Sequence, residues 1–597
     1  MSYIELNLTG SKLGCGEGGC GACTVLVSQC VDQHSGSLDH RTVNACLAPL
    51  CSIDGCQIIT VEGLGSVAKS NLHPTQSRLA EMYGSQCGFC TPGIIMSLYG
   101  TVAASNQSHS SMTMLDIEEA FDGNLCRCTG YRPILDAAKS FAKDFNELPD
   151  KDPSSSKCSI TTTTLDKCRS FVKDLDNESN KIEFPNELRE HVAQSIHIKG
   201  STIEWFRPVS LNELLSLRST YPGAASKLVF GNSEVQIETK FKRLKYPRLI
   251  SVTHIQELQQ LKRTPTSLIL GAGVTLTRLQ AKLSEWNDQQ LDGGICESII
   301  QQLKFFASTQ IRNVASLGGN IVNASPISDL NPVLQAAGAI LELHRTETNS
   351  TRLVPMQEFF LAYRRVAMTD DEVLVCIHIP LPPPPSTTTT RTFLRSYKQA
   401  RRRDDDIGIV SAGLKVQLEP AQENDKQQWR IISASFSFGG MGPTTILTKN
   451  TQQELIGKLW TKTTINEACQ LALKEMPLTD LTPGGQPEYR RTLVQSFLFK
   501  FYLYVCTQLQ ESSVDSKELS ATQPYHRSVS HGQQIIPERP ASQKVVGASL
   551  PHRSAYLQTT GEAKYVDDMP SLPNTLYGGL VLATQPNALI KSIGKII

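Results

Sequence analysis

Eight of the seventeen cysteines fall into two groups, and the first of these has a spacing typical of iron ligation. Cys15, Cys20 and Cys23 form C-x4-C-x2-C, and Cys46 follows after a further twenty-two residues. This is the plant-type ferredoxin pattern for a [2Fe–2S] cluster, which needs four converging thiolates. A single zinc ion more often takes paired C-x2-C arms. A backbone able to curl closely around the sulfides is supplied by Gly14, Gly16, Gly18, Gly19 and Gly21.

The second group is two short cysteine arms. Cys87 and Cys90 form C-x2-C, and Cys126 and Cys128 form C-x-C thirty-five residues later. Taken alone, two such arms also suit a tetrahedral zinc ion. A second one-electron carrier beside the first would form a relay, so we interpret this quartet as another [2Fe–2S] site. The remaining cysteines are assigned no role, because free cysteine is often a small buried residue.

Length and composition limit the class of protein. The chain has 597 residues, 19% of them charged, and a formal net charge of +1. This size indicates several domains, and the balanced charge gives no reason to expect binding to nucleic acid or to anionic membranes. No basic and apolar leader and no apolar stretch of membrane-spanning length is present. We therefore expect a cytoplasmic protein, with the peroxisome as the alternative location.

Hydrophobic periodicity predicts a multidomain α+β fold with distinct iron–sulfur and later parts. Strand runs among glycine loops indicate a small β unit first. A helical pattern follows, with a capping box at Thr113 and Asp116 and a proline at the first turn of a helix at Pro133. The expected segments are a ferredoxin-like domain at 1–75, a helical domain at 76–146, a linker at 147–203, an α+β domain at 204–385, its C-terminal subdomain at 391–508, a second linker at 509–545 and an incomplete new domain at 546–597.

Three segments of the second half carry glycine, asparagine and serine at turns: 228–235, 315–332 and 398–407. Turn N–H groups and small side chains let a backbone approach a diphosphate without a dedicated lysine. Any one such segment is equally well an ordinary loop. The sequence GAGVTL at 271–276 lacks the last glycine of a dinucleotide fingerprint, so a Rossmann fold is not predicted.

The motifs KLGCGEGGCGACTV, NACLAPLCS, GSQCGFCTPGIIMS and GNLCRCTGYRPIL resemble the iron–sulfur region of the xanthine dehydrogenase and aldehyde oxidase family. The resemblance implies a β-grasp domain for the first cluster, a helical domain for the second, and a position for Gln86 near a molybdenum cofactor. The three later segments resemble the family's two-part FAD-binding domain. The resemblance implies that the flavin lies beside the second cluster, receives electrons singly and delivers a hydride.

The resemblance also implies individual contacts. Phe359, Phe360, Tyr363 and Arg364 resemble a segment that the dehydrogenase branch uses for NAD, and RRRDDD at 401–406 resembles its acidic flavin-side loop. Both favour a dehydrogenase over an aldehyde oxidase. The implied FAD contacts are Leu228, Val229, Phe230, Gly231, Asn232, Ser233, Glu234, Val235, Phe306, Ser316, Leu317, Gly318, Gly319, Asn320, Asp329, Leu374 and Lys398.

The family pattern extends beyond this sequence at both ends. Only fourteen residues precede Cys15, where the family has a strand pair, so Met1–Leu13 would have to replace it. GEAKYVDDMP at 561–570 resembles the start of a molybdenum domain whose catalytic residues are not present. We expect a fragment of a longer enzyme, or one subunit of a split enzyme. The resemblance implies that the complete enzyme oxidises hypoxanthine and xanthine to urate with NAD as acceptor, and that it is a homodimer. The alternatives are an aldehyde oxidase-like fragment and a non-catalytic product that binds full-length homologues.

Overall fold

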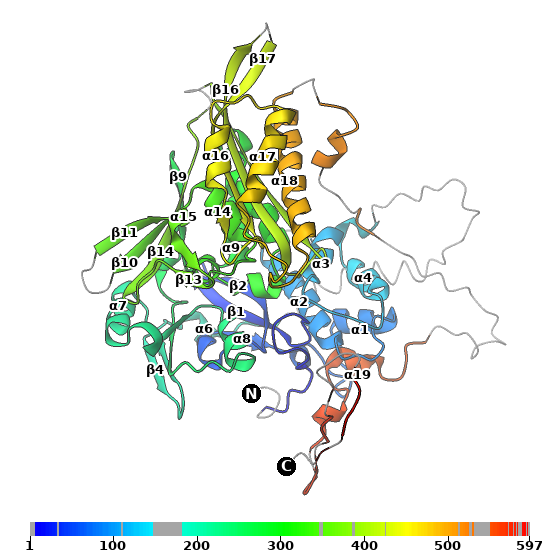
Figure 1. Cartoon of the computed structure of the whole chain (residues 1–597). Coiled ribbons are helices and arrows are strands. Elements are labelled where there is room, and N and C mark those ends of the chain that lie inside the picture. Colours follow the sequence, from blue (N-terminus) through cyan, green and yellow to red (C-terminus); the bar gives the residue numbers. More distant parts are fainter. Residues whose placement is uncertain are drawn as a thin grey trace, which may run out of the picture.

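The structure is a computed structural model whose described residues form four sheets of three to five strands, one two-stranded sheet and the helices around them (Figure 1). The predicted multidomain α+β class is confirmed. The first predicted linker, at 147–203, lies outside the described residues up to position 181. The described residues are 6–32, 35–108, 112–146, 182–345, 350–384, 389–423, 426–510, 514–523, 528–530, 550–570, 572–576, 578–580, 582, 588–592 and 594.

The N-terminal sheet has the order β2-β1-β3 and is antiparallel throughout. Its strands are β1 (Thr24–Asp32), β2 (Ser37–Asn44) and β3 (Gln57–Ile59). The first five residues of β1 are all buried, because helix α2 of the next unit packs against β1 and β2. The two iron–sulfur units therefore share packing. Short 3-10 helices complete the sheet's loops at η1 (Leu50–Ser52) and η2 (Val61–Gly63).

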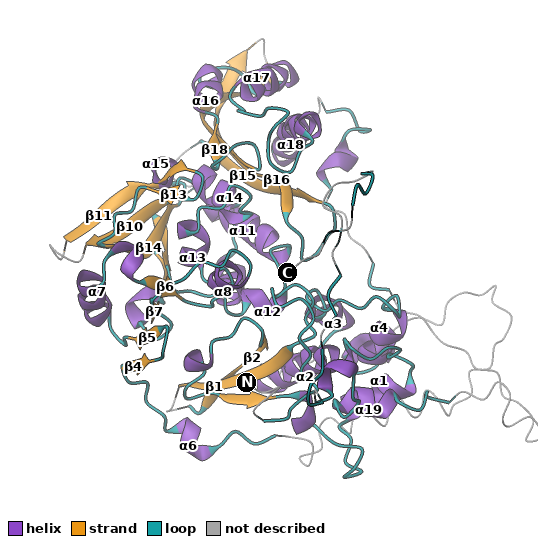
Figure 2. Ribbon diagram, turned by 60° about the horizontal axis from the view of Figure 1, so that its bottom comes forward, coloured by secondary structure: helices purple, strands orange, loops and turns teal. Residues whose placement is uncertain are grey.

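The second unit is helical, as the sequence predicts. Thr113 accepts a hydrogen bond from the Asp116 amide, and the Asp116 side chain accepts one from the Thr113 amide, which confirms the capping box. Pro133 lies in the first turn of its helix, also as expected. Figure 2 shows these helices grouped beside β1 and β2. They are α1 (Pro74–Glu81), α2 (Thr91–Ser108), α3 (Met114–Ala120), α4 (Arg132–Lys139) and the 3-10 turn η3 (Lys143–Asn146).

The third unit combines two sheets. The first has the order β4-β5-β7-β6, with parallel pairing of β5 and β6 to β7, and the second has the order β11-β10-β14-β9-β8. Their strands are β4 (Ile196–Lys199), β5 (Glu204–Arg207), β6 (Lys227–Val229), β7 (Arg248–Ser251), β8 (Leu261–Arg263), β9 (Ser267–Gly271), β10 (Ile340–Arg345), β11 (Ser350–Pro355) and β14 (Glu372–Pro380). A small hairpin is formed by β12 (Phe360–Ala362) and β13 (Arg365–Val366).

The largest apolar core of the third unit includes Leu317, Leu374 and Phe359. The helices of this unit follow in chain order. They are α6 (Asn186–Arg189), α7 (Leu211–Thr220), α8 (Val235–Lys240), α9 (Leu276–Trp286), α10 (Gln289–Asp292), α11 (Ile295–Lys304), α12 (Thr309–Arg312), α13 (Leu317–Val322), α14 (Leu330–Ala337) and α15 (Met356–Phe359), with 3-10 turns η5 (Gly223–Ala225) and η6 (Gln256–Leu258).

The fourth unit is a sheet between helices. Along β16, Val410, Ala412 and Leu414 are buried against the helices that follow in the chain, while Ser411 and Gly413 face α14. This period of two is what a sheet covered on both faces requires. The elements are β15 (Arg391–Ala400), β16 (Gly408–Glu423), β17 (Lys426–Gly439), β18 (Ile446–Leu447), α16 (Lys449–Leu455), α17 (Lys462–Lys474) and α18 (Pro487–Gln508).

After α18 the chain returns to the iron–sulfur units. At 528–530, the Ser530 carbonyl accepts a hydrogen bond from the buried Lys139 ammonium, which also pairs with Glu118. Helix α19 (Ala555–Thr560) then packs against α1, and Figure 1 shows this late segment beside the earliest helices. The remaining turns are η7 (Leu519–Thr522) and η9 (Val566–Asp568). Among the residues that the structure describes, no helix combines the length and apolar character needed to cross a bilayer.

Candidate functional site

The first cysteine quartet lies in one loop and at the end of a strand. The loop from Cys15 to Cys23 precedes β1, and Cys46 follows β2, the strand that pairs with β1. Its curvature uses left-handed backbone at Gly16, Gly18 and Gly21, with φ of +68°, +82° and +65°. A Cβ on Gly21 would come within 2.2 Å of the Gly123 carbonyl oxygen, so this glycine also permits contact with the helical unit.

The four thiols of this quartet form two adjacent pairs. Cys15 and Cys20 are hydrogen-bonded to each other, as are Cys23 and Cys46, and Cys20 lies close enough to Cys23 to interact electrostatically. A hydrogen bond from Cys23 lowers the pKa of Cys46 to about 7, with a further contribution from the Lys240 ammonium. The same hydrogen bond raises the pKa of Cys23. Within this pair, the hydrogen bond therefore favours the thiolate form of Cys46.

The second quartet shows the same arrangement. Cys87 pairs with Cys128 and Cys90 pairs with Cys126, and Cys126 also interacts electrostatically with Cys87. Hydrogen bonds from Cys90 and then Thr129 lower the pKa of Cys126 to about 5, although partial burial opposes this shift. The Tyr131 hydroxyl accepts a hydrogen bond from the Cys126 amide at 3.0 Å, which fixes the loop before α4.

Each quartet has the number and pairing of thiols that a diiron cluster needs. Among the described residues, no three His, Cys, Asp or Glu side chains converge on a point that one metal ion could occupy. Two adjacent pairs of thiols match a [2Fe–2S] core, in which four thiolates serve two irons.

Two of the segments predicted to bind FAD meet at the edge of the third unit. Gly231 lies against the Val314 carbonyl, where an added Cβ would come within 2.1 Å, so the 228–235 loop approaches the start of the 316–320 segment. Ser316 caps α13 by accepting a hydrogen bond from the Gly319 amide. Helix α13 packs against β14, which carries Leu374. The predicted contacts on these three elements therefore lie together.

The remaining predicted FAD residues surround a buried ion pair. Lys398 and Asp329 are 2.7 Å apart, with 5% and 9% of their side chains exposed. Lys398 also donates to the Phe305 carbonyl, next to Phe306, and Ser411 donates to Asp329. Burial raises the pKa of Asp329, and the lysine and Ser411 oppose this rise. This contact joins the two subdomains of the flavin region, because Asp329 precedes α14 while Lys398 and Ser411 lie on β15 and β16.

One loop of the candidate site was not predicted from the sequence. The Gly318 and Leu317 amides donate to the carbonyls of Ala272 and Val274, at 2.8 and 3.0 Å, and the Phe230 ring lies near Gly273. The 271–274 loop therefore supports the first turn of α13 through these two backbone hydrogen bonds. The two glycines of GAG are the signal that could have identified it, because small residues allow such close backbone approach.

The predicted NAD segment divides into a buried and an exposed half. Phe359 is fully buried in the core, and Phe360 packs beside it. Tyr363 is 61% exposed at the tip of the β12–β13 hairpin. Arg364 donates to Glu234 at 2.7 Å and to Asn323 at 2.9 Å, so it ties the hairpin to the 228–235 loop.

The 401–406 segment lies on the opposite side, against the helical iron–sulfur unit. Burial raises the pKa of Asp405 to about 7, and the nearby Asp122 carboxylate adds to the shift. Asp122 itself pairs with Arg312 at 2.7 Å. This loop therefore borders the contact between the flavin region and the iron–sulfur region.

The loop predicted to bind FAD contacts the first cysteine quartet. The Asn232 side-chain amide donates to the Leu47 carbonyl at 2.8 Å, one residue after Cys46, and Lys240 reaches the Gly16 carbonyl at 3.4 Å. The 228–235 loop thus contacts the first quartet, while Gln310 of the same region donates to Asn124, two residues before Cys126. Which of the two clusters lies nearer to the flavin stays a prediction. The sequence could not show the contact of Asn232 with Leu47, because it joins residues 185 positions apart.

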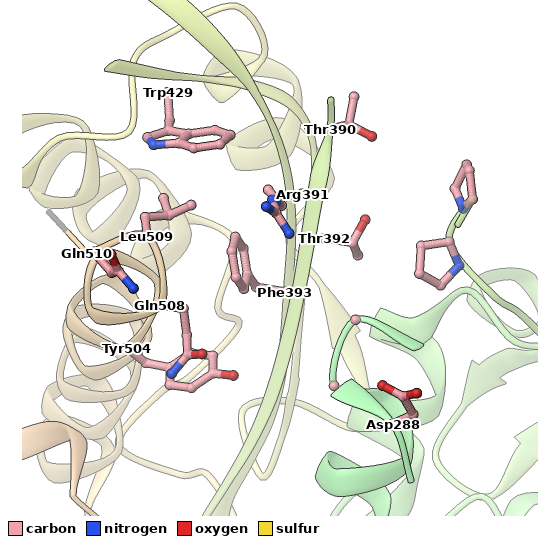
Figure 3. A pocket seen from close by; sticks show the side chains of 14 residues that line it. Asp288, Thr390, Arg391, Thr392, Phe393, Trp429, Tyr504, Gln508, Leu509 and Gln510 are labelled. Carbon is pink, nitrogen blue, oxygen red and sulfur yellow. The ribbon is translucent and has the colours of Figure 1, made fainter. Parts of the chain in front are cut away.

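One hollow among the described residues lies away from the candidate site. A hollow of about 710 Å³ lies between β15, the end of α18 and the β16–β17 hairpin, with Trp429, Phe393 and Tyr504 among its lining side chains (Figure 3). None of its lining residues is a predicted cluster or FAD contact. The cofactor assignment therefore rests on thiol pairing and on backbone loops, and we assign this hollow no function.

Comparisons with known proteins agree with this organisation. A [2Fe–2S] binding domain matches residues 60–139, an FAD binding domain in molybdopterin dehydrogenase matches 201–382, and a CO dehydrogenase flavoprotein C-terminal domain matches 395–505. Xanthine dehydrogenases from Oryza sativa and Arabidopsis thaliana are 40% and 41% identical to this protein over 99% of its chain. The xanthine dehydrogenase/oxidase of Gallus gallus is 39% identical over the same share. The chain belongs to the xanthine dehydrogenase family.

The similarity covers less than half of each of these relatives. The chain spans 45% of the rice and Arabidopsis relatives and 46% of the chicken relative. A Cu,Mo-CO dehydrogenase structure is 21% identical over 50% of this chain and 96% of its own, with a TM-score of 0.42. An aldehyde oxidoreductase structure from Desulfovibrio gigas is 38% identical over 23% of this chain and 14% of its own, with a TM-score of 0.20.

The matched domains account for both kinds of cofactor in this xanthine dehydrogenase family member. All four residues of the second quartet lie within the [2Fe–2S] binding domain, and the predicted FAD contacts from 228 to 374 lie within the FAD binding domain. The chain therefore carries [2Fe–2S] and FAD. The assignment of Cys15, Cys20, Cys23 and Cys46 to a cluster, and of individual residues to FAD, remains our proposal.

Proposed function

We propose that this chain is the electron-transfer part of a xanthine dehydrogenase-type enzyme, which delivers electrons removed from hypoxanthine or xanthine at a molybdenum cofactor to NAD. When bound, the clusters carry single electrons, and FAD links one-electron to two-electron chemistry. The observation that carries the proposal is the contact of the 228–235 loop with the first quartet, through Asn232 and Leu47. The order we propose is the Cys87 quartet, then the Cys15 quartet, then FAD, then NAD.

The chain's own residues have distinct parts in this scheme. The paired thiols of each quartet hold the irons, and Cys126 and Cys46 are the most readily ionised members of their pairs. Lys240 places a positive charge beside Cys46, which favours the electron-rich state of a neighbouring cluster. Asn232 holds the flavin loop against that quartet, and the Lys398–Asp329 pair holds the two flavin subdomains together.

The nicotinamide side is assigned to the β12–β13 hairpin. Tyr363 offers an exposed aromatic face, and Arg364 anchors the hairpin to the FAD loop through Glu234. A planar nicotinamide can stack on such a face. The purine substrate, NAD and a homodimeric assembly are parts of this proposal, because the chain spans less than half of its relatives' length.

We expect flavin-loaded protein to oxidise NADH with an artificial electron acceptor. Replacing Tyr363 with alanine should raise the KM for NADH roughly five- to tenfold, because one aromatic contact is lost. The measurement is steady-state kinetics at matched flavin content. Leu361→Ala is the control, since Leu361 is 60% exposed on the same hairpin and offers no ring. Flavin-loaded wild-type protein that does not react with NADH would contradict the assignment of NAD as acceptor.

A further inference from the structure

Residues 552–568, which we call the strap, lie across both cysteine loops. They follow the flavin region in the chain but pack far from it, with α19 against α1 (Figure 1). The strap is fixed at its centre by Glu562, whose carboxylate accepts hydrogen bonds from the Ser66 hydroxyl and the Val67 amide at 2.6 and 2.8 Å. Although partial burial opposes ionisation, these and the Thr560 hydroxyl lower the pKa of Glu562, so the contact is charge-assisted.

The strap donates directly to the backbone of a predicted cluster ligand. The Gln558 side-chain amide donates to the carbonyls of Gln86 and Cys87 at 3.1 and 3.2 Å. The Tyr565 hydroxyl donates to the same Cys87 carbonyl at 2.7 Å. Gly88 has a φ of +77°, and a Cβ there would come within 2.2 Å of Gln558. The Gln86–Gly88 turn is therefore shaped around the strap.

The strap also reaches the loop of the first quartet. Lys12 and Asp568 are 2.8 Å apart, and their side chains are 2% and 1% exposed. The Lys12 ammonium lies 4.6 Å from the centroid of the Tyr565 ring, and the Lys12 amide donates to the Ala22 carbonyl, next to Cys23. Removing one partner of such a buried ion pair is strongly destabilising, because the other charge is left buried without a partner. It fixes Tyr565 at the place where its hydroxyl meets Cys87.

This arrangement matters because Cys87 is exposed even with the strap in place. Cys87 and Cys128 are both exposed thiols, whereas Cys126 is buried. The turn that carries Cys87 has two donors on one carbonyl, both from a segment more than 470 positions away. Donors around a ligand orient it and favour the electron-rich state of the metal site. The strap therefore acts on the solvent-facing pair of the second quartet.

We propose that the strap is a positioning element for the second cluster, in which Gln558 and Tyr565 hold the Cys87 turn and so retain iron and raise the cluster's reduction potential. This inference rests on the proposed function, since it requires a [2Fe–2S] cluster on the Cys87 quartet. Neither side chain is a ligand or touches the reacting atoms. Their effect is exerted through the backbone of Cys87.

The test compares Tyr565→Phe and the double variant Tyr565→Phe with Gln558→Met, both in the full chain. Phenylalanine keeps the ring beside Lys12 and Phe89 and removes only the hydroxyl donor. The protein is incubated with a ferrous chelator. The iron loss from each cluster is monitored as the decay of that cluster's electron paramagnetic resonance signal. We expect the second cluster to lose iron about tenfold faster in the double variant, as the loss of hydrogen bonds to one turn predicts. Its potential, from a redox titration, should fall.

Tyr556→Phe is the matched control, because this tyrosine lies on α19 beside Glu81 and not at the Cys87 turn. It should leave both clusters unchanged. Wild-type rates and potentials in both strap variants would overturn the inference, as would equal effects on the two clusters. If the double variant fails to assemble, the single Tyr565→Phe decides. Wild-type protein without a second cluster would instead contradict the proposed function itself.

Discussion

Replacing Cys126 with serine is expected to reduce the iron content from about four to about two atoms per chain. Cys126 receives a hydrogen bond from Cys90 and has a pKa of about 5, so it is the thiol of its pair that most readily becomes a thiolate ligand. A serine hydroxyl does not ionise comparably near neutral pH. Iron analysis and electron paramagnetic resonance of the reduced protein should show one cluster signal lost and the other retained.

The controls for this prediction separate ligation from general damage. Cys30→Ser changes a partly buried cysteine of β1 that belongs to neither quartet, and it should leave both signals intact. Cys46→Ser should remove the other signal. If the protein instead contains about two irons and one zinc, and Cys126→Ser removes the zinc, the second quartet is a structural zinc site and the relay is wrong.

Replacing Lys398 with methionine is expected to destabilise the flavin region by about 3 to 5 kcal/mol and to lower its FAD content. The substitution leaves Asp329 buried without its 2.7 Å partner. Burial already raises the pKa of Asp329, and loss of the lysine raises it further. A carboxyl with a raised pKa in the folded state favours folding as the pH falls, so the deficit should be smaller at about pH 5 than at about pH 8. Thermal unfolding with flavin quantification measures both effects.

Two further variants test the cause. Lys415→Met removes a lysine from the same sheet that donates to the Ala337 carbonyl, so it strands no charge, and the loss should be smaller. Adding Asp329→Asn to Lys398→Met removes the unpaired carboxylate and should restore much of the stability. A double variant as unstable as the single would show that the lysine acts through packing and not through its charge.

Local patterns in the sequence were sufficient to predict the helix starts and the grouping of three cysteines in one loop. Cys15, Cys20 and Cys23 lie within one loop, so their spacing alone limits the geometry in which they can meet. The Thr113 capping box and the proline of α4 likewise depend on residues a few positions apart. Such features are confirmed because their physical cause is contained in the segment itself.

Contacts between distant segments could not be predicted in the same way. The contact of the flavin loop with the first quartet depends on Asn232 and Leu47, and the strap depends on Lys12 and Asp568, 556 positions apart. The 271–274 loop has no dinucleotide fingerprint, yet its carbonyls accept hydrogen bonds from the amides of α13. Periodicity reports which residues are buried and not which partner buries them.

The most direct test of the whole account is the metal and flavin content of the purified protein, with an electron paramagnetic resonance spectrum after reduction. The account predicts about four irons and one FAD per chain and two distinct signals from reduced [2Fe–2S] clusters. A single signal, or zinc in place of two of the irons, would contradict the claim that both cysteine quartets carry electrons to the flavin.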